Sequence, residues 1–208
     1  MNQKFLPLTI DGQRVYAGFW KRLVAGFADF IVLIPFIAFF TWLEGFDRNL
    51  AIVVSIPSTA LFAFYHVFFN ARFGGTPGKL LVGIRIRRPD GSPIEWSHAW
   101  WRSSVDLVFA FLFLCANVWA LSQIDPVTYS GLGWMARAEE IGALHPAWFG
   151  LIFILQQIWI WGELIVLLLN KRKRAIHDFI AGTVVIKNEF SEPVAGINSV
   201  PSLRDLTP

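Results

Sequence analysis

The sequence predicts an all-α membrane protein with four transmembrane helices and a small cytoplasmic β element. Of its 208 residues, 55% are hydrophobic and only 16% are charged. A soluble domain of this length cannot bury that much apolar surface in one core, and the chain lacks the polar shell that buried soluble helices need. Four apolar runs are long enough to cross a bilayer, and the basic residues are unevenly divided among the segments between them.

The four runs are the first elements of the prediction. A hydrocarbon core is crossed by about 20 helical residues, with roughly 17–25 tolerated. The runs satisfy this length, the third at its lower limit, and they cover residues 23–43, 50–69, 105–121 and 147–169. The first run starts too far from the N-terminus, is too long and lacks a small-residue cleavage site, so we do not interpret it as a cleaved signal peptide.

The distribution of Lys and Arg predicts the orientation. Of 18 basic residues, only Arg48 and Arg137 lie in the loops that follow the first and third runs. The positive-inside rule therefore places both termini and the segment 70–104 in the cytoplasm. The basic composition is explained by topology, and no aromatic-basic platform for nucleic acid accompanies it. The lipid bilayer is the expected partner, and the "KRKR" stretch at 171–174 is expected to attract anionic headgroups.

The remaining segments predict the soluble parts. Within an N-terminal lead, 1–18, "IDGQRV" indicates a turn between two extended fragments. The β-branched pieces "GIRI" and "TVVI" are expected to pair as a small sheet that joins the middle segment to the C-terminal segment. The tail, 188–208, has the composition of a disordered segment. The outer segment, 122–146, contains a stretch amphipathic enough for a short interfacial helix, and we leave open whether it lies on lipid, caps the bundle or binds a partner.

An aspartate inside the first run is the most informative polar residue. Arg22 and Asp29 are seven residues apart, so they share one helix face with a rise of roughly 10 Å between them. A carboxylate at bilayer depth must be neutral, paired or facing water. Asp178, after the last run, is a candidate partner that bonds Arg22 from the cytoplasmic side. Two interpretations follow: either these residues dock the C-terminal segment under the bundle, or Asp29 binds and releases a proton or small cation.

Three further residues near the run boundaries are candidates. Arg102 and Asp106 are four residues apart and are expected to pair on one helix face. Glu163 lies inside the fourth run without a partner in its own helix, and we expect it either to reach the cytoplasmic interface or to have a functional role. His66, near the end of the second run, is interpreted as a packing histidine.

A glycine-rich loop follows the second run. The stretch "GGTPGKL" fails the phosphate-loop pattern at both ends, because Phe73 stands where glycine is required and Leu80 follows the lysine. We interpret the loop as a tight re-entry from the membrane, with Lys79 at headgroup level. The residues of this loop motif are Gly74, Thr76, Pro77, Gly78 and Lys79. The four histidines are scattered and no nucleophile motif is present, so we expect no metal, no cofactor and no enzymatic activity.

These features together resemble the RDD family of multi-pass bacterial membrane proteins. The resemblance rests on the Arg and Asp of the first run, on "GGTPGKLLVGIRI" and "DGSPIEW", and on "RAIHDFIAGTVVI" after the last run. It implies one membrane domain, 19–187, in the bacterial inner membrane, with Arg22, Asp29 and Asp178 as the matching family positions. Some family members are implicated in sodium–proton exchange, so the resemblance implies transport only weakly.

Two functions remain open from the sequence. The first is transport of protons or small cations, which predicts a homo-oligomer and an Asp29 that faces a hydrated cavity. The second is a non-transporting scaffold or assembly partner of another envelope complex, which predicts a dry Asp29 held by helix packing.

Overall fold

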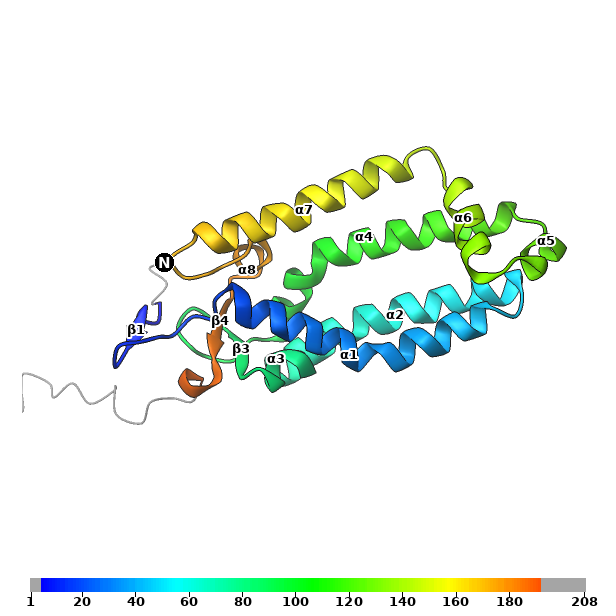
Figure 1. Cartoon of the computed structure of the whole chain (residues 1–208). Helices are drawn as coiled ribbons and strands as arrows, with labels where there is room; N and C mark the ends of the chain where they lie inside the picture. The colour runs from blue at the N-terminus through cyan, green and yellow to red at the C-terminus, as the bar shows by residue number, and fades with distance from the viewer. Residues whose placement is uncertain (1–4, 192–208) are drawn as a thin grey trace, which may run out of the picture.

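The structure, a computed structural model, describes residues 5–191 and contains the four expected long helices. They are α1 (Phe19–Glu44), α2 (Arg48–Phe73), α4 (Trp96–Gln123) and α7 (Phe149–Leu169) (Figure 1). All four are long and apolar enough to cross a membrane. The prediction of an all-α membrane protein with four spans is therefore confirmed.

The third helix begins earlier than its apolar run. α4 starts at Trp96, where Glu95 and His98 form a capping box, rather than at residue 105. Its first turns carry the polar residues Arg102 and Ser103, which are both buried. A hydropathy scan detects only the lipid-facing part of a helix, so this polar, protein-facing beginning was missed.

The helices pack in chain order and leave much of their surface apolar and exposed. α1 contacts α2, α2 contacts α4, and α4 contacts α7. Figure 1 shows α7 along one side of the bundle and α1 along the other. Large side chains such as Phe27, Ile31 and Ile158 are more than half exposed, as expected of groups that face lipid.

The two ends of the bundle differ. We call one the basic end: it carries the starts of α1 and α4, the ends of α2 and α7, and the short helices α3 (Pro77–Leu81) and α8 (Ile176–Ile180). We call the other the far end. Most fully buried apolar residues lie at the basic end, in a core that includes Ile84, Ile86 and Val185.

The predicted sheet lies at the basic end. β3 (Ile84–Arg87) pairs antiparallel with β4 (Val184–Lys187), which confirms the expected "GIRI" and "TVVI" pairing. The N-terminal lead adds to the other edge of β4, where Tyr16 bridges Ile186 and the Ala17 nitrogen donates to the Val185 carbonyl over 2.9 Å. The sheet therefore joins three segments that are far apart in the sequence.

The N-terminal turn and the tail complete this end. β1 (Thr9–Ile10) and β2 (Gln13–Arg14) form the expected hairpin, with Asp11 and Gly12 at positive φ in its turn. Residues Asn188–Phe190 form a 3-10 helix, η1. The rest of the predicted disordered tail, from residue 192, lies outside the described residues.

Two short helices cover the far end. They are α5 (Pro126–Gly131) and α6 (Trp134–Ala143). The buried Tyr129 donates its hydroxyl to the Glu44 carbonyl over 2.8 Å, and Arg48 donates to the Ile124 carbonyl over 3.0 Å. The outer segment is thus fixed to the turn between α1 and α2, while α6 itself has no fully buried residue.

Candidate functional site

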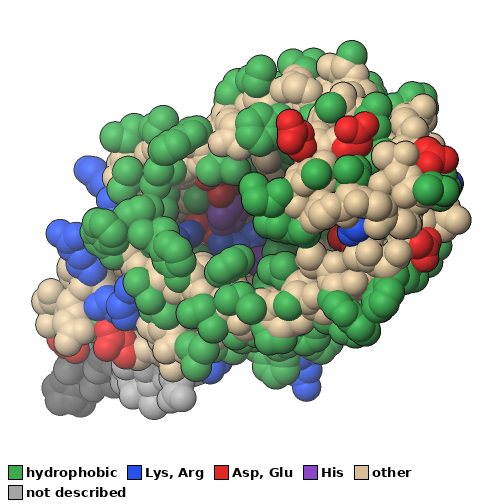
Figure 2. Space-filling view, turned by 45° about the vertical axis from the view of Figure 1, so that its right-hand side comes forward, with side chains coloured by type: hydrophobic (Ala, Val, Ile, Leu, Met, Phe, Trp, Pro, Cys, Tyr) green, Lys and Arg blue, Asp and Glu red, His purple; other side chains and the backbone are tan. Residues whose placement is uncertain are grey.

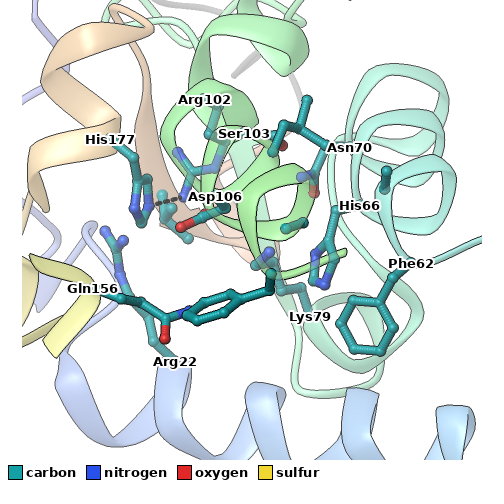
Figure 3. A pocket seen from close by; sticks show the side chains of 15 residues that line it. Arg22, Phe62, His66, Asn70, Lys79, Arg102, Ser103, Asp106, Gln156 and His177 are labelled. Atoms are coloured by element: carbon teal, nitrogen blue, oxygen red, sulfur yellow. Dashed lines mark hydrogen bonds between the residues drawn. The ribbon is translucent and has the colours of Figure 1, made fainter. Parts of the chain in front are cut away.

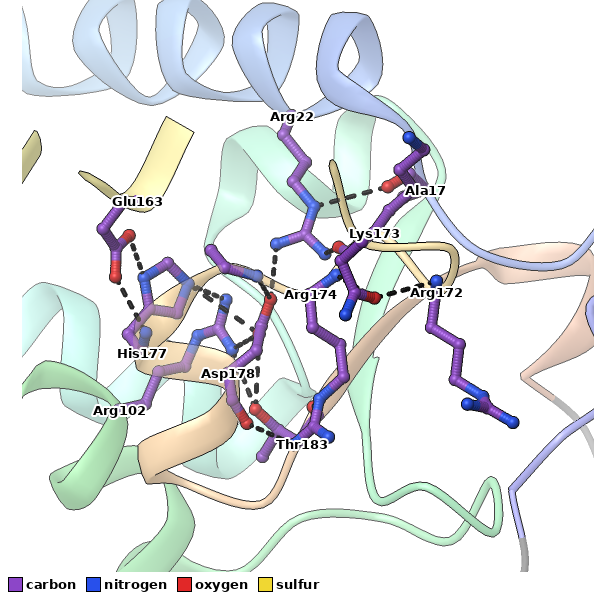
Figure 4. Close-up of polar contacts among 12 residues, drawn as sticks. Ala17, Arg22, Arg102, Glu163, Arg172, Lys173, Arg174, His177, Asp178 and Thr183 are labelled. Atoms are coloured by element: carbon purple, nitrogen blue, oxygen red, sulfur yellow. Dashed lines mark hydrogen bonds and ion pairs between the residues drawn. The ribbon is translucent and has the colours of Figure 1, made fainter. Parts of the chain in front are cut away.

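A buried carboxylate organises the basic end. Asp178 in α8 has no exposed surface, and two arginines from different helices bind it (Figure 4). Arg22 of α1 donates to Oδ2 over 2.8 Å, and Arg102 of α4 donates to Oδ1. The Ala175 backbone nitrogen adds a third bond to Oδ2, over 2.9 Å. The predicted contact between Arg22 and Asp178 is therefore present.

The charge of Asp178 follows from these contacts. Burial raises the pKa of its carboxyl, but the Arg102 and Arg22 guanidinium groups outweigh burial and hold the pKa well below its usual value. Arg174 binds the backbone around the same residue, with bonds to the carbonyls of Asp178 (2.9 Å) and Thr183 (3.0 Å). The ionised Asp178 thereby fastens α8 and the start of β4 beneath α1 and α4.

A second layer extends the network to α7. The Glu163 carboxylate accepts from the His177 backbone nitrogen over 2.8 Å and also pairs with His177 Nδ1. Arg102 Nη2 lies 2.7 Å from His177 Nε2. Because a guanidinium only donates, His177 Nε2 must be the acceptor. His177 Nδ1 must then carry the ring proton and donate a hydrogen bond to Glu163. Burial and the nearby Arg102 lower the pKa of His177, which agrees with this neutral ring.

Asp29 has a different role from Arg22. Its carboxylate accepts from the Tyr65 hydroxyl (2.6 Å), the Thr76 hydroxyl (2.5 Å) and the Gly78 backbone nitrogen (2.7 Å). It is 6% exposed, so this intramembrane acid is dry and its oxygens are occupied. Arg22 makes no hydrogen bond to it in the described chain. Asp29 instead caps the N-terminus of α3, a position where negative charge is stabilised.

The glycine of the loop motif explains how α3 approaches so closely. A Cβ at Gly78 would lie 2.5 Å from the Asp29 backbone nitrogen and would overlap the Ala25 carbonyl oxygen. Only glycine allows the two backbones to meet at this distance. The expected tight re-entry is therefore a docking of α3 on α1, with Gly74 at φ 72° ending α2 and Pro77 starting α3.

The bundle contains a cavity of about 600 Å³ near the basic end. Figure 3 shows side chains from α1, α2, α3, α4, α7 and α8 around it. Three cations contribute to its wall, Arg22, Lys79 and Arg102. We call it the basic-end cavity.

Two polar side chains of this wall have atoms without hydrogen-bond partners among the described residues. Lys79 is half-buried, lines the cavity and makes no hydrogen bond or ion pair within residues 5–191. Burial, followed by the nearby Arg102, lowers the pKa of Lys79 to about 8. Asn70 is 2% exposed, and its buried Oδ1 has no partner among the described atoms. The docking of α3 turns Lys79 inward, which sequence position alone did not indicate.

The expected pair between Arg102 and Asp106 is absent. Arg102 pairs with Asp178 instead, because a fully buried carboxylate gains more from a buried cation than an exposed carboxylate does. Asp106 lies on the exposed side of α4 and accepts one bond, from Trp159 Nε1 of α7 over 3.1 Å. His66, interpreted as a packing residue, lines the same cavity as Asp106 and His177.

A second cavity, of about 480 Å³, lies toward the far end. Its wall includes Glu44, Ser55, Thr59 and Asn117. We call it the far-end cavity. Three residues line both cavities, namely Phe62, Ala110 and Phe113. The bundle thus holds two cavities in sequence along its axis, with two aromatic rings where they meet.

Sequence reasoning missed several members of this site. Tyr65 and Thr183 were unremarkable in the sequence, although each binds a buried aspartate. A signal existed for Arg174 and His177, because they flank Asp178 within a conspicuously polar stretch. Among residues 5–191, no three His, Cys, Asp or Glu side chains gather as metal ligands.

Comparisons with known proteins agree with this architecture. The model of the RDD family matches residues 16–182, which is most of the chain. The chain is 27% identical over 170 residues to the uncharacterized protein YckC of Bacillus subtilis (strain 168), covering 81% of this chain and 83% of that protein. No solved structure matches. With its four membrane-spanning helices and this family match, the chain belongs to the RDD family of membrane proteins.

Proposed function

We propose that this protein transports a solute across the membrane through its two cavities. The observation that carries the proposal is that the basic-end and far-end cavities meet at Phe62, Ala110 and Phe113. Each cavity brings polar side chains into the membrane-spanning part of the bundle, where they are costly unless they serve packing or a path. Hydrophobic side chains between two polar chambers are a known way to gate a pore.

The charge of the wall supports some solutes over others. Arg22, Lys79 and Arg102 line the basic-end cavity, whereas Asp106 is the one carboxylate among the described residues of its wall. This arrangement disfavours a bare metal cation, because like charges at close range repel in a medium of low dielectric constant. A proton remains compatible, since His66 and His177 stand on the same wall. In this proposal the titrating groups belong to the cavity wall and not to Asp29, whose oxygens are occupied.

A non-transporting scaffold is the second candidate, and the dry Asp29 favours it. A buried acid that caps α3 is what the scaffold function requires of this residue. The exposed helix α6 at the far end offers a surface for a partner. A homo-oligomer is expected if transport is the function.

Transport is tested in proteoliposomes that hold a pH-sensitive dye. Gradients of sodium chloride, potassium chloride and potassium phosphate are imposed in turn. We expect the wild-type protein to change the internal pH with at least one of them. Phe62→Trp places a larger ring between the cavities and should lower the initial rate by about an order of magnitude.

The matched control lies on the same helix. Phe64→Trp makes the same change two residues away, at a side chain that is 57% exposed and lines neither cavity. It should leave the rate unchanged. Silence of the wild-type protein in all three gradients would count against transport and favour the scaffold. An equal loss of rate in both variants would mean that Phe62 has no special role at the junction.

A further inference from the structure

Two side chains on the wall of the basic-end cavity carry opposite charge and have no charged partner in the described part of the chain. Lys79 of α3 makes no ion pair or hydrogen bond within residues 5–191, whereas Asp106 of α4 accepts one hydrogen bond, from an indole. They belong to different parts of the wall. In Figure 3, Lys79 lies beside His66, and Asp106 lies toward His177.

The other charged groups nearby are already satisfied. Arg22 donates to Asp178 and to two backbone carbonyls, and Arg102 donates to Asp178, Thr183 and His177. Among the residues that the structure describes, the cavity therefore offers one free ammonium, that of Lys79, and one carboxylate with a single hydrogen bond, that of Asp106. Asn70 adds a buried amide with an unpaired oxygen. Buried polar groups without partners inside a protein are usually completed by something else, such as water, an ion or a ligand.

Another part of the lining is apolar, and the cavity is open to the surface. Phe62, Leu107 and Phe113 cover part of its wall, and its volume falls within the roughly 300–1,000 Å³ of small-molecule sites. Figure 2 shows a hollow with histidine and charged side chains inside and hydrophobic side chains around the rim. At the level of the spanning helices, a hydrophobic rim faces acyl chains, so a molecule can enter from the bilayer.

We propose that the basic-end cavity binds the head of an amphiphile that carries both an oxyanion and a primary ammonium. The oxyanion accepts from Lys79. The ammonium donates to Asp106, and the apolar part lies against the aromatic side chains and the rim. Charge-assisted bonds of this kind are the strongest polar contacts available to a protein. The inference concerns binding alone and goes beyond the proposed function.

Binding can be measured without transport. The full chain, purified in a non-ionic detergent, is titrated calorimetrically with short-chain phosphatidylethanolamine, whose head carries both groups. Phosphatidylcholine of the same chain length keeps the phosphate but has no N–H to donate. Phosphatidylglycerol keeps only the oxyanion, and inorganic phosphate lacks the apolar part. We expect phosphatidylethanolamine to bind about tenfold more tightly than each of the other three.

The variants separate the two charges. Lys79→Gln should weaken phosphatidylethanolamine and phosphatidylglycerol alike, by about tenfold. Asp106→Asn should weaken phosphatidylethanolamine by a similar factor and leave phosphatidylglycerol unchanged. Lys21→Gln removes the same charge at an exposed position of α1 and should change neither. Asp106 is exposed, so its variant is expected to fold, and Lys79→Arg serves as a charge-preserving second variant at the half-buried site.

Several results would overturn the inference. Equal affinity for all three lipids, or affinities that Lys79→Gln and Asp106→Asn leave unchanged, would remove the head-group site. Inorganic phosphate that binds as tightly as the lipid would reduce the site to one for a free oxyanion. Selective lipid binding with no flux in any gradient would overturn the transport proposal alone. Flux without selective binding would overturn this inference alone.

Discussion

At the scale of single residues, Asp178 is the most consequential side chain of the basic end. It has no exposed surface and balances two arginines that come from different spanning helices. Removing one member of such a buried group leaves the others charged and unpaired, which costs more than the group itself contributes. In the described chain, Arg22 and Arg102 pair with no other carboxylate. Asp178 therefore holds α8 in place.

Asp178→Asn should lower the free energy of unfolding by about 3–5 kcal/mol, because it leaves both guanidinium groups without their counter-charge. The measurement is an SDS titration in mixed micelles, followed by tryptophan fluorescence. Glu189→Gln breaks an exposed ion pair with Lys187 and should cost less than about 1 kcal/mol. If the two variants lost the same stability, Asp178 would not be the centre of the network.

At the scale of elements, the docking of α3 on α1 depends on the absence of a Cβ atom at Gly78. A Cβ at Gly78 would collide with backbone atoms of Ala25 and Asp29, and backbone cannot move aside as a flexible side chain can. Gly78→Ala should therefore destabilise the protein by about 1–3 kcal/mol and loosen Lys79 from the cavity.

Gly26 of α1 provides a control, for which the same substitution is expected to change stability in the opposite direction. A Cβ at this position meets no atom within 4 Å. Because alanine is a better helix former than glycine, Gly26→Ala should be neutral or stabilise by about 0.5–1 kcal/mol. Opposite signs for the two glycines, in the same SDS titration, are expected. Destabilisation by both variants to the same extent would deny Gly78 its special contact.

The elements also show what could be predicted from the sequence. Apolar length located the four spans, and β-branched residues located β3 and β4, because both signals are local. The pairing of Arg102 was predicted wrongly, because the rule of four-residue spacing sees only the helix's own neighbours and not Asp178, which lies 76 residues away. The inward direction of Lys79 was not predicted for the same reason, since it depends on how α3 docks on α1. The cavities arise from packing between helices and left no local pattern.

At the scale of the whole molecule, one end of the bundle is basic and tightly built, and the other is covered by two short helices. Three segments from different parts of the chain meet in the sheet at the basic end, so both described ends of the chain lie there. Sixteen of the 18 Lys and Arg residues lie either in segments at this end or in the sequence before and after the described residues. The positive-inside rule then predicts that the basic end faces the cytoplasm.

Orientation is tested by labelling single cysteines in intact cells with a membrane-impermeant maleimide. Cys115, the chain's single cysteine, is first replaced by serine. Ser92→Cys lies in the loop before α4 at the basic end, and Glu139→Cys lies on the exposed helix α6. We expect Glu139→Cys to react at once and Ser92→Cys to react only after the cells are permeabilised. The reverse pattern would mean that the protein has the opposite orientation in the membrane. The cavity that contains Lys79 and Asp106 would then open near the outer leaflet.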